Sequence, residues 1–258
     1  MASNNPFEVH GISHLSASNI NLFVTDKAKW IAQYLFKMRD ETSPSAIRGN
    51  VLEHCLNLIK SNDDEIRSGS KYVEHHVLHK KFNEECVAEG FDLDDEKVQK
   101  EADKLFKYFH NMLYLFVDCK NFNQYQQKIF LNIWDLPVPF IGYTDFITND
   151  DVIDLKTTLR MPSEPSEGHK RQLAMYQMAY QDKNCSLYYV TPTKFQGFEY
   201  SKKELQYYSE QTNQICFAIQ KFLSISNDKE ELASLVYPDY DSWMWSENMK
   251  LKAKEIWR

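Results

Sequence analysis

The stretch GYTDFITNDDVIDLKTT, residues 142–158, contains two β-rich runs separated by a turn signal at Thr148-Asn149-Asp150-Asp151. Turn residues of this kind between two extended runs predict an antiparallel hairpin. If Asn149 and Asp150 form its tip, the numbers of paired residues sum to 299. This register places Asp145 directly opposite Asp154, with their β-carbons about 4.5–5.5 Å apart.

The two faces of the predicted hairpin differ in chemistry. Because successive side chains of a strand point to opposite faces, Lys156 lies on the same face as Asp145 and Asp154. The other face is apolar and can pack against a helix; it carries Phe146, Ile153 and Leu155. The register therefore gathers two carboxylates and one ammonium on one side of the hairpin.

Two carboxylates at this distance repel each other unless a cation lies between them. Oxygen ligands suit Mg²⁺ or Mn²⁺, which also accept phosphate oxygens of a substrate. Such an ion lowers the pKa of a water molecule and stabilises charge that develops on a phosphate, while Lys156 can hold the attacking hydroxide or the scissile phosphate. The alternative is a solvated hairpin in which Asp154 and Lys156 are an ordinary surface pair, because Asp-x-Lys is a common tripeptide.

The segments around the hairpin predict an α/β fold. Before it, the residue pattern indicates helices at 19–37, 45–60 and 93–118. Strands are expected at Tyr125–Trp134, Phe140–Thr148 and Val152–Thr157. A helix at 167–182, a strand at Ser186–Thr191 and helices at 201–224 and 242–257 follow. Helices, then a strand meander, a helix and a further strand indicate an α/β core with additional helices.

The composition suits a folded protein but is acidic for a protein that binds nucleic acid. Of the 258 residues 43% are hydrophobic, which is enough for a continuous core. The net charge of -7 disfavours a broad electrostatic contact with phosphates. Basic residues nevertheless gather between Lys156 and Lys183, so we expect a basic cleft on an acidic body. The alternative is an acidic protein that never meets nucleic acid.

The remaining features of the sequence bear on compartment and cofactor. Five widely spaced cysteines without a C-x-x-C pair indicate a reducing compartment rather than a disulfide framework or a zinc ribbon. The N-terminus lacks the pattern of a signal peptide, and no apolar run approaches the roughly 18 residues of a membrane span. We therefore expect a soluble cytoplasmic protein with no membrane partner. A phage protein inside its host cell also fits this expectation. The chain has no Walker A motif, so no ATP is expected.

Five segments, in order, resemble the RecB-like branch of the PD-(D/E)XK nucleases, and within it the phage recombination exonucleases. They are Ser16-Ala-Ser18, RGNVLE at 48–53, the hairpin with GYTDFI and VIDLKTT, HKRQLAMY at 169–176, and LYYVTP at 187–192. The resemblance, from about residue 13 to 195, implies a restriction-endonuclease-like core, that is, a mixed central β-sheet flanked by helices, with additional helices. It implies one nuclease domain over 1–258, with a helical part at about 1–120, a catalytic sheet core at about 121–195 and C-terminal helices at about 200–258.

By this resemblance the metal ligands are Glu53, Asp145, Asp154 and the main-chain carbonyl of Leu155, and Lys156 is catalytic. Many relatives carry histidine at the helix position, so His54 is the alternative to Glu53. Counting four residues from Gly49 selects Glu53. The resemblance also assigns Gln172 and Tyr176 to organising the catalytic site and contacting DNA, although Tyr176 could equally be a core residue.

Further DNA contacts are expected from side chains that can reach phosphates: Ser16, Ser18, Arg48, Arg160, His169, Lys170 and Arg171. For the arginines at 160 and 171 and the lysine, solvated surface is the alternative, and the two serines could merely cap a helix. Some relatives hold an iron–sulfur cluster with four cysteines. Here the early position falls near Thr25-Asp26 and Cys216 stands alone in the tail, so no iron–sulfur cluster is expected.

The sequence thus predicts a Mg²⁺- or Mn²⁺-dependent deoxyribonuclease, an exonuclease more than an endonuclease, acting by two-metal-type water activation in phage-type recombination or replication. A structure-specific or nicking endonuclease and a catalytically idle DNA-binding scaffold are the alternatives. The implied partners are DNA and a single-strand annealing protein. Aromatic residues at 93–118 and 237–257 further predict a homo-oligomer, such as a trimer that encloses DNA, unless they merely cover the sheet.

Overall fold

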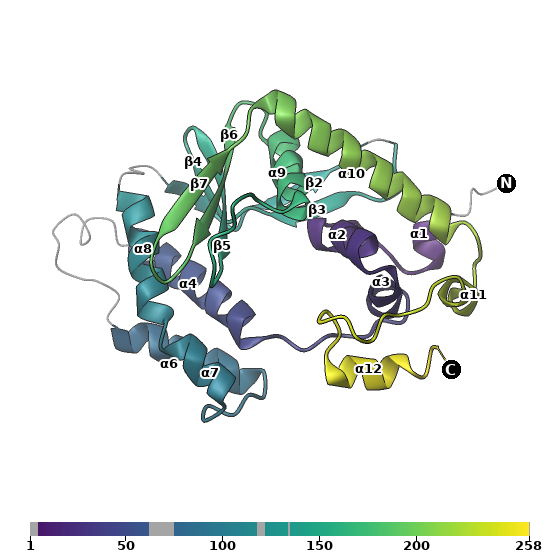
Figure 1. Ribbon diagram of the computed structural model, residues 1–258. Helices are drawn as coiled ribbons and strands as arrows, with labels where there is room; N and C mark the ends of the chain where they lie inside the picture. Colours follow the sequence, from purple (N-terminus) through teal and green to yellow (C-terminus); the bar gives the residue numbers. More distant parts are fainter. Residues whose placement is uncertain (1–4, 62–74, 118–121, 134, 258) are drawn as a thin grey trace.

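The computed structural model describes residues 5–61, 75–117, 122–133 and 135–257 (Figure 1). Its helices are α1 (Pro6–Val9), α2 (Ala17–Thr25), α3 (Lys27–Tyr34), α4 (Pro44–Ser61), α6 (His75–Ala88), α7 (Glu96–Ala102), α8 (Leu105–Val117), α9 (Glu167–Ala179), α10 (Lys202–Leu223), α11 (Lys229–Ser234) and α12 (Glu247–Ala253). Its strands are β1 (Phe122–Tyr125), β2 (Lys128–Leu131), β3 (Phe140–Tyr143), β4 (Phe146–Thr148), β5 (Asp151–Thr157), β6 (Asn184–Val190) and β7 (Phe195–Glu199).

Five of the strands form one mixed sheet in the order β1-β4-β5-β6-β7, and β2 and β3 form a separate pair. Strands β5 and β6 are parallel, whereas the other neighbours in the sheet are antiparallel. Parallel neighbours need a crossover connection, and α9 supplies it between β5 and β6. The predicted fold class, a mixed sheet flanked by helices, is confirmed.

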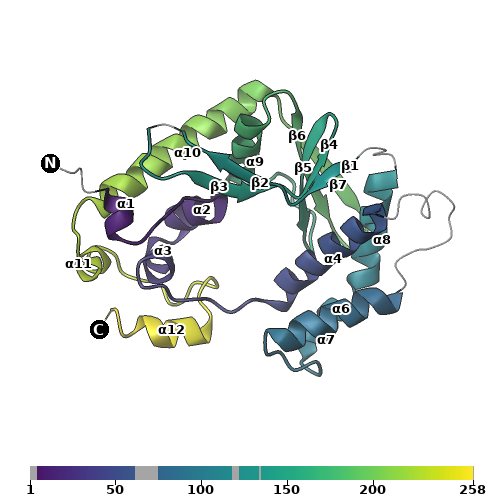
Figure 2. The same ribbon diagram turned by 180° about the vertical axis from the view of Figure 1, so that it is seen from behind.

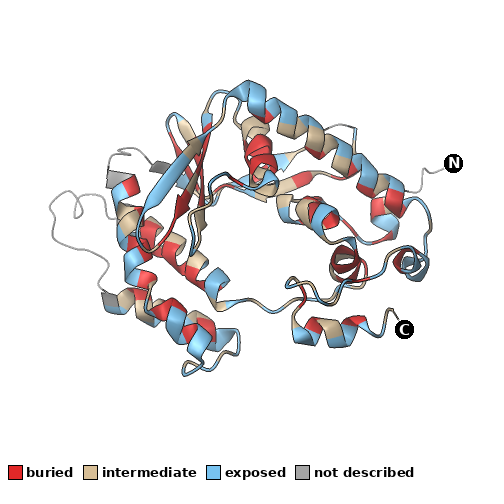
Figure 3. Cartoon of the chain, in the orientation of Figure 1, coloured by how far each residue is buried: buried red, intermediate tan, exposed pale blue. Residues whose placement is uncertain are grey.

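Helices cover both faces of this sheet. The apolar back of the hairpin, formed by Phe146, Ile153 and Leu155, packs on the layer of α4, α6, α7 and α8, as its side-chain alternation predicts. Ile147 and Val152 point the other way and pack against α9. The two helical layers can be followed from both sides in Figures 1 and 2. In Figure 3 much of α9 is buried, whereas exposed residues run along α10, the outer helix of its layer.

The two expected strands before the turn are each interrupted, at residues that lie opposite each other. Tyr125 pairs with Phe146 in the main sheet, and Lys128 pairs with Tyr143 in the β2–β3 pair. Between them, Gln126 donates from its backbone to the Asp145 carbonyl and has a positive φ of 47°. The long antiparallel pair therefore keeps one register but bends, so that β2 and β3 leave the main sheet.

Two of the expected helices are also interrupted. The helix predicted at 19–37 ends as α2 at Thr25, because the Asp26 side chain accepts from Lys29 N at 2.8 Å and caps a new helix. The one predicted at 93–118 divides at Asp103-Lys104 into α7 and α8. The C-terminal helix covers only Glu247–Ala253, and α1, α6, α11 and β7 had no prediction. Residue 118 and Trp134, both within predicted elements, lie outside the described residues.

No helix in the described part of the chain combines the length and the apolar character that a membrane crossing requires.

Candidate active site

The bend in the hairpin opens one edge of β5. Strand β4 pairs with β5 only at Phe146–Ile153 and Ile147–Val152, which is the predicted register, and the chain leaves the sheet at Asp145. The Leu155 N–H therefore donates to Asp145 Oδ2, at 2.7 Å, instead of to a strand. Since the N–H and C=O of one strand residue point to the same neighbour, the Leu155 carbonyl faces this opening too.

Asp154 and Lys156 lie at the same opening. The Asp154 side chain is 1% exposed, and its Oδ1 accepts a hydrogen bond of 3.0 Å from Lys156 Nζ. The second oxygen, Oδ2, lies 2.8 Å from the same nitrogen but accepts no hydrogen bond of suitable geometry within the described residues. Burial by itself would lower the pKa of the Lys156 ammonium, but the nearby carboxylates of Asp154 and Asp145 raise it above its usual value, so the ammonium stays charged. A buried carboxylate oxygen thus has a lone pair available beside a fixed positive charge.

Glu53 on α4 approaches this pair from the layer of α4, α6, α7 and α8. Burial, followed by the negative charges of Asp145 and Asp154, raises the pKa of Glu53 to about 9. Burial and the charge of Asp154 likewise raise the pKa of Asp145 to about 7. Since adjacent helical residues are rotated by about 100°, His54 points away from the direction of Glu53. The structure therefore brings Glu53 to the two aspartates.

This group of side chains suits a divalent cation. When ionised, the three carboxylates carry two more negative charges than Lys156 can balance, and they offer the hard oxygen atoms that Mg²⁺ and Mn²⁺ prefer. Asp154 Oδ2, which contacts Lys156 but accepts no hydrogen bond within the described residues, is a further available oxygen. Over the described ranges, no three acidic, histidine or cysteine side chains are gathered as tightly as around a bound ion.

Helix α9 provides the wall of the site opposite α4. Tyr176 is 1% exposed; its hydroxyl donates to the Tyr143 carbonyl at 2.5 Å and accepts from Gln172 Nε2 at 2.6 Å. Its ring is therefore a core residue, while its hydroxyl and Gln172 line the site beside Asp154. One turn earlier, His169 Nδ1 lies 2.5 Å from the Tyr189 hydroxyl. Burial and the charge of Lys156 lower the pKa of His169.

Two basic side chains of α9 that were expected in a basic cleft are instead buried and engaged within the fold. Lys170 is 3% exposed and forms ion pairs with Glu164 and Glu167. Arg171 is also buried and donates to Asn21 on α2 and Gln211 on α10. Neither side chain is placed to contact phosphate. Arg160, after β5, is exposed, as that prediction requires.

Arg48 is also buried rather than presented to DNA. Its guanidinium forms an ion pair with Glu101 and lies 4.3 Å from the centre of the Tyr108 ring. Nη2 donates to Thr157 Oγ1 at 3.2 Å, next to Lys156. Helix α4 passes close to β5 at Gly49, where a β-carbon would make an ordinary van der Waals contact of 3.4 Å with the same hydroxyl. Arg48 therefore fixes α4, which carries Glu53, against the end of β5.

We expect Arg48→Ala to cost about 3–5 kcal/mol of unfolding free energy, because it leaves the Glu101 carboxylate buried without a partner. The double variant Arg48→Met, Glu101→Leu should recover most of that loss. Urea denaturation measures both. A second readout is the slope of DNA affinity against salt, which a lost phosphate contact would reduce by about one. A reduced slope with unchanged stability would contradict the buried role.

Ser16 has a structural role besides the predicted DNA contact, and two other residues with contacts to site residues were not predicted at all. Ser16 Oγ caps α2 by accepting from Asn19 N at 3.2 Å, and it lies 3.0 Å from Ser18 Oγ. Gln126, whose side chain lies beside Glu53 and lowers its pKa, and Tyr189, the partner of His169, were not predicted. No sequence signal marked Gln126, because its position follows from the bend.

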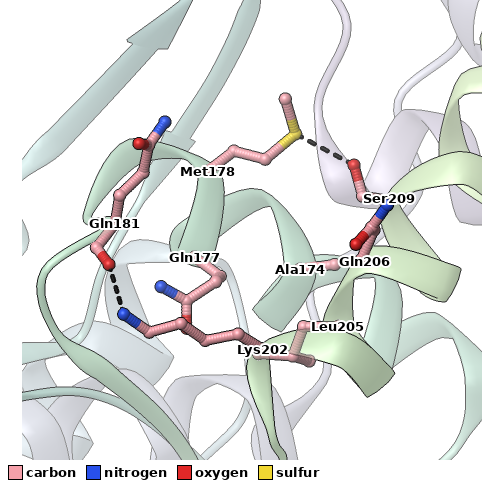
Figure 4. Close-up of a pocket in the computed structure, with 8 residues that line it drawn as sticks. All are labelled: Ala174, Gln177, Met178, Gln181, Lys202, Leu205, Gln206 and Ser209. Carbon is pink, nitrogen blue, oxygen red and sulfur yellow. Dashed lines mark hydrogen bonds between the residues drawn. The ribbon is translucent and has the colours of Figure 1, made fainter.

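A cavity of about 320 Å³ lies elsewhere, between α9 and α10 (Figure 4). Two of its polar groups have partners: Lys202 Nζ donates to the Gln181 carbonyl at 2.6 Å, and the Ser209 hydroxyl donates to the Met178 sulfur at 3.1 Å. Ala174 and Met178 line it from the face of α9 opposite to Gln172 and Tyr176. This cavity is therefore separate from the candidate active site.

Comparisons with known proteins agree with this geometry at the level of the family. The family model described as "PD-(D/E)XK nuclease superfamily" matches residues 14–238. A crystal structure of a presumed exonuclease from Eubacterium rectale is similar, with a TM-score of 0.60 and 11% identity over 97% of this chain and 92% of that one. That of SSO0001 is less similar, with a TM-score of 0.31 and 13% identity over 76% of this chain and 86% of that one. A search of curated proteins finds no match.

The mixed sheet brings Asp154 and Lys156 of β5 together with Asp145, which directly precedes β4. The chain belongs to the PD-(D/E)XK nuclease superfamily.

Proposed function

We propose that this protein is a Mg²⁺- or Mn²⁺-dependent DNA exonuclease of the RecB-like branch, acting in phage-type recombination or replication. The observation that carries the proposal is the convergence of Glu53, Asp145 and Asp154 on Lys156 at the open edge of β5. Digestion from an end is supported by the sequence resemblance to phage recombination exonucleases. The name of the structurally similar protein from Eubacterium rectale agrees with it.

In this proposal Glu53, Asp145, Asp154 and the Leu155 carbonyl hold the metal. When bound there, the metal lowers the pKa of water and stabilises negative charge on the phosphate. The Lys156 ammonium, fixed by Asp154, holds the attacking hydroxide or the scissile phosphate. Gln172 and the Tyr176 hydroxyl orient the groups on the α9 side, and Arg160 and His169 contact the DNA backbone.

The experiment compares a labelled linear duplex with a covalently closed circle of the same sequence, each with Mg²⁺ and with a chelator. An exonuclease shortens the linear molecule progressively and leaves the circle intact. Opening of the circle at a comparable rate would identify an endonuclease instead. Cleavage of neither, together with normal DNA binding, would identify a catalytically idle scaffold.

The raised carboxylate pKa values predict how the stability of the metal-free protein depends on pH. The folded state holds protons on Asp145 and Glu53 up to pKa values of about 7 and about 9, whereas the unfolded chain releases them near pH 4 (roughly the free carboxyl value). The stability that these protons contribute is therefore present below about pH 4. It is lost as the pH rises through the pKa values that the two carboxyls have in the folded state.

We accordingly expect the Tm of chelator-treated protein to fall by several degrees between about pH 5 and about pH 9. Mg²⁺ or Mn²⁺ should raise it again at the upper pH, because the ion binds the ionised carboxylates. Asp145→Asn should flatten the pH profile. A Tm that rose over this range without metal would contradict the assignment of these shifts.

The aromatic residues that motivated a homo-oligomer divide into two groups. Trp245 is buried, whereas Tyr237 and Trp243 are 79% and 90% exposed. The exposed pair is available for contacts between subunits, and we propose a trimer on that ground. A single-strand annealing protein is proposed as a partner from the sequence resemblance alone. Light scattering tests the first: a mass near 30.5 kDa, with and without DNA, would rule out the ring.

A further inference from the structure

The bend that opens the active site also creates an exposed sheet face beside it. The β2–β3 pair buries Ile129 and Phe140 on its inner side, toward α9 and the N-terminal helices. Lys128 pairs with Tyr143, and Phe130 pairs with Ile141, so all four share the outer side. The rings of Phe130 and Tyr143 are 56% and 55% exposed. Figure 2 shows this pair of strands between α9 and α2.

This outer face is continuous with the active site and with the start of α2. Tyr143 ends β3, its carbonyl accepts from Tyr176, and Asp145 follows two residues later. At the other edge of β3, Leu15 bridges to Phe140 with its side chain inward, so that Ser16 belongs to the outer side. A chain that crosses the face from the active site would therefore pass the two aromatic rings and reach the Ser16 hydroxyl.

The chemistry of the face favours a nucleic acid strand over a second acidic protein. Its outward residues on β2 and β3 include Lys128 and no carboxylate, although the chain has a net charge of -7. Diagonal neighbours such as Phe130 and Tyr143 have β-carbons about 7–8 Å apart, a spacing that two successive unstacked bases can match. Exposed aromatic rings beside a basic group are the recurring platform for unpaired bases, whereas a duplex hides its base faces.

We propose that the outer face of β2 and β3 binds the single-stranded end of a DNA substrate, with successive bases stacked on Phe130 and Tyr143. This inference rests on the proposed nuclease function and deepens it, because it names an unpaired strand as what passes the active site. Lys128 contacts the phosphates of that strand, and Ser16 lies at the far end of its path.

The test measures the Kd of a fluorescently labelled oligothymidylate by anisotropy, in chelator so that no cleavage occurs. Phe130→Ala and Tyr143→Ala should each raise Kd about tenfold, within the range for one base that loses its stacking partner. Tyr143→Phe keeps the ring and should stay within about twofold of the wild type. Tyr207→Ala is the matched control, because Tyr207 is 60% exposed on α10, away from this face.

Unchanged binding by both alanine variants would overturn the inference. So would light scattering that shows a wild-type oligomer which these variants dissociate, because the face would then be a protein interface. Cleavage of linear DNA by the wild type with Mg²⁺ distinguishes a failure of this inference from a failure of the proposed nuclease function. If the wild type cleaves and the alanine variants bind normally, only this inference fails; if the wild type neither binds nor cleaves, the proposed function fails too.

Discussion

Asp154→Asn is expected to lower DNA cleavage by about a thousandfold or more, the loss that corresponds to several kcal/mol of transition-state stabilisation. The side chain is 1% exposed at the open edge of β5, and its Oδ2 accepts no hydrogen bond from the described residues. An amide there cannot supply the second anionic oxygen that the metal requires. Cleavage of a labelled linear duplex, measured over a range of Mg²⁺ concentrations, gives the result.

The matched control is Asp150→Asn, at the exposed tip of the same hairpin. Asp150 joins its neighbours through its backbone, which accepts from Asn184 N at 2.8 Å, so this variant should cleave normally. Asp154→Asn removes a buried charge and should keep its Tm and most of its DNA affinity. Near-normal Mg²⁺-dependent cleavage by a folded Asp154→Asn protein would mean that this hairpin is not the active site.

Lys156→Ala is expected to reduce kcat by two to four orders of magnitude (roughly the loss for a charge that acts in the transition state) while Kd for DNA changes little. The Lys156 ammonium lies 2.8 Å from Asp154 Oδ2, so it is held in place before substrate arrives. Its charge therefore acts mainly on the reacting phosphate or on the attacking hydroxide. Single-turnover cleavage and anisotropy, performed on the same DNA, separate the two effects.

Arg160→Ala provides the contrast, because Arg160 is exposed on the loop after β5. As a phosphate contact, it should lower affinity and reduce the salt slope by about one, with little effect on the single-turnover rate. Equal losses of binding and rate in Lys156→Ala would make Lys156 another such anchor and remove its catalytic role.

The hairpin was predictable because its information is local. The turn residues fix a register, and the register alone decides that Phe146 and Ile153 face one helical layer while Asp154 faces the other. The fold class followed from the order of helices and strands. Both conclusions depend on residues that are neighbours in sequence.

The bend at Gln126 and Asp145 was not predictable in the same way. Neither residue is a glycine or a proline, yet Gln126 adopts a positive φ of 47° and the strand pairing continues on both sides. The bend depends on β1 and β4 packing in the main sheet while β2 packs on α9. It is therefore decided by tertiary contacts, as is the position of Gln126 beside Glu53.

The basic residues show a second limit. A lysine or arginine near a predicted catalytic motif has the same sequence signal whether it binds phosphate or stabilises the fold. Arg171 joins α9 to Asn21 and Gln211, which lie 150 and 40 residues away in the chain. Such partners become visible only when the helices are placed in space.

The most direct test of the proposed active site is a crystal structure of the protein with Mn²⁺ and DNA, together with an anomalous difference map that locates the manganese. We predict a manganese peak that contacts Asp145, Asp154 and Glu53, with the scissile phosphate beside Lys156. The same map distinguishes Glu53 from His54 as the helix ligand. A manganese peak remote from these carboxylates, or DNA bound with its phosphates away from the open edge of β5, would contradict the account.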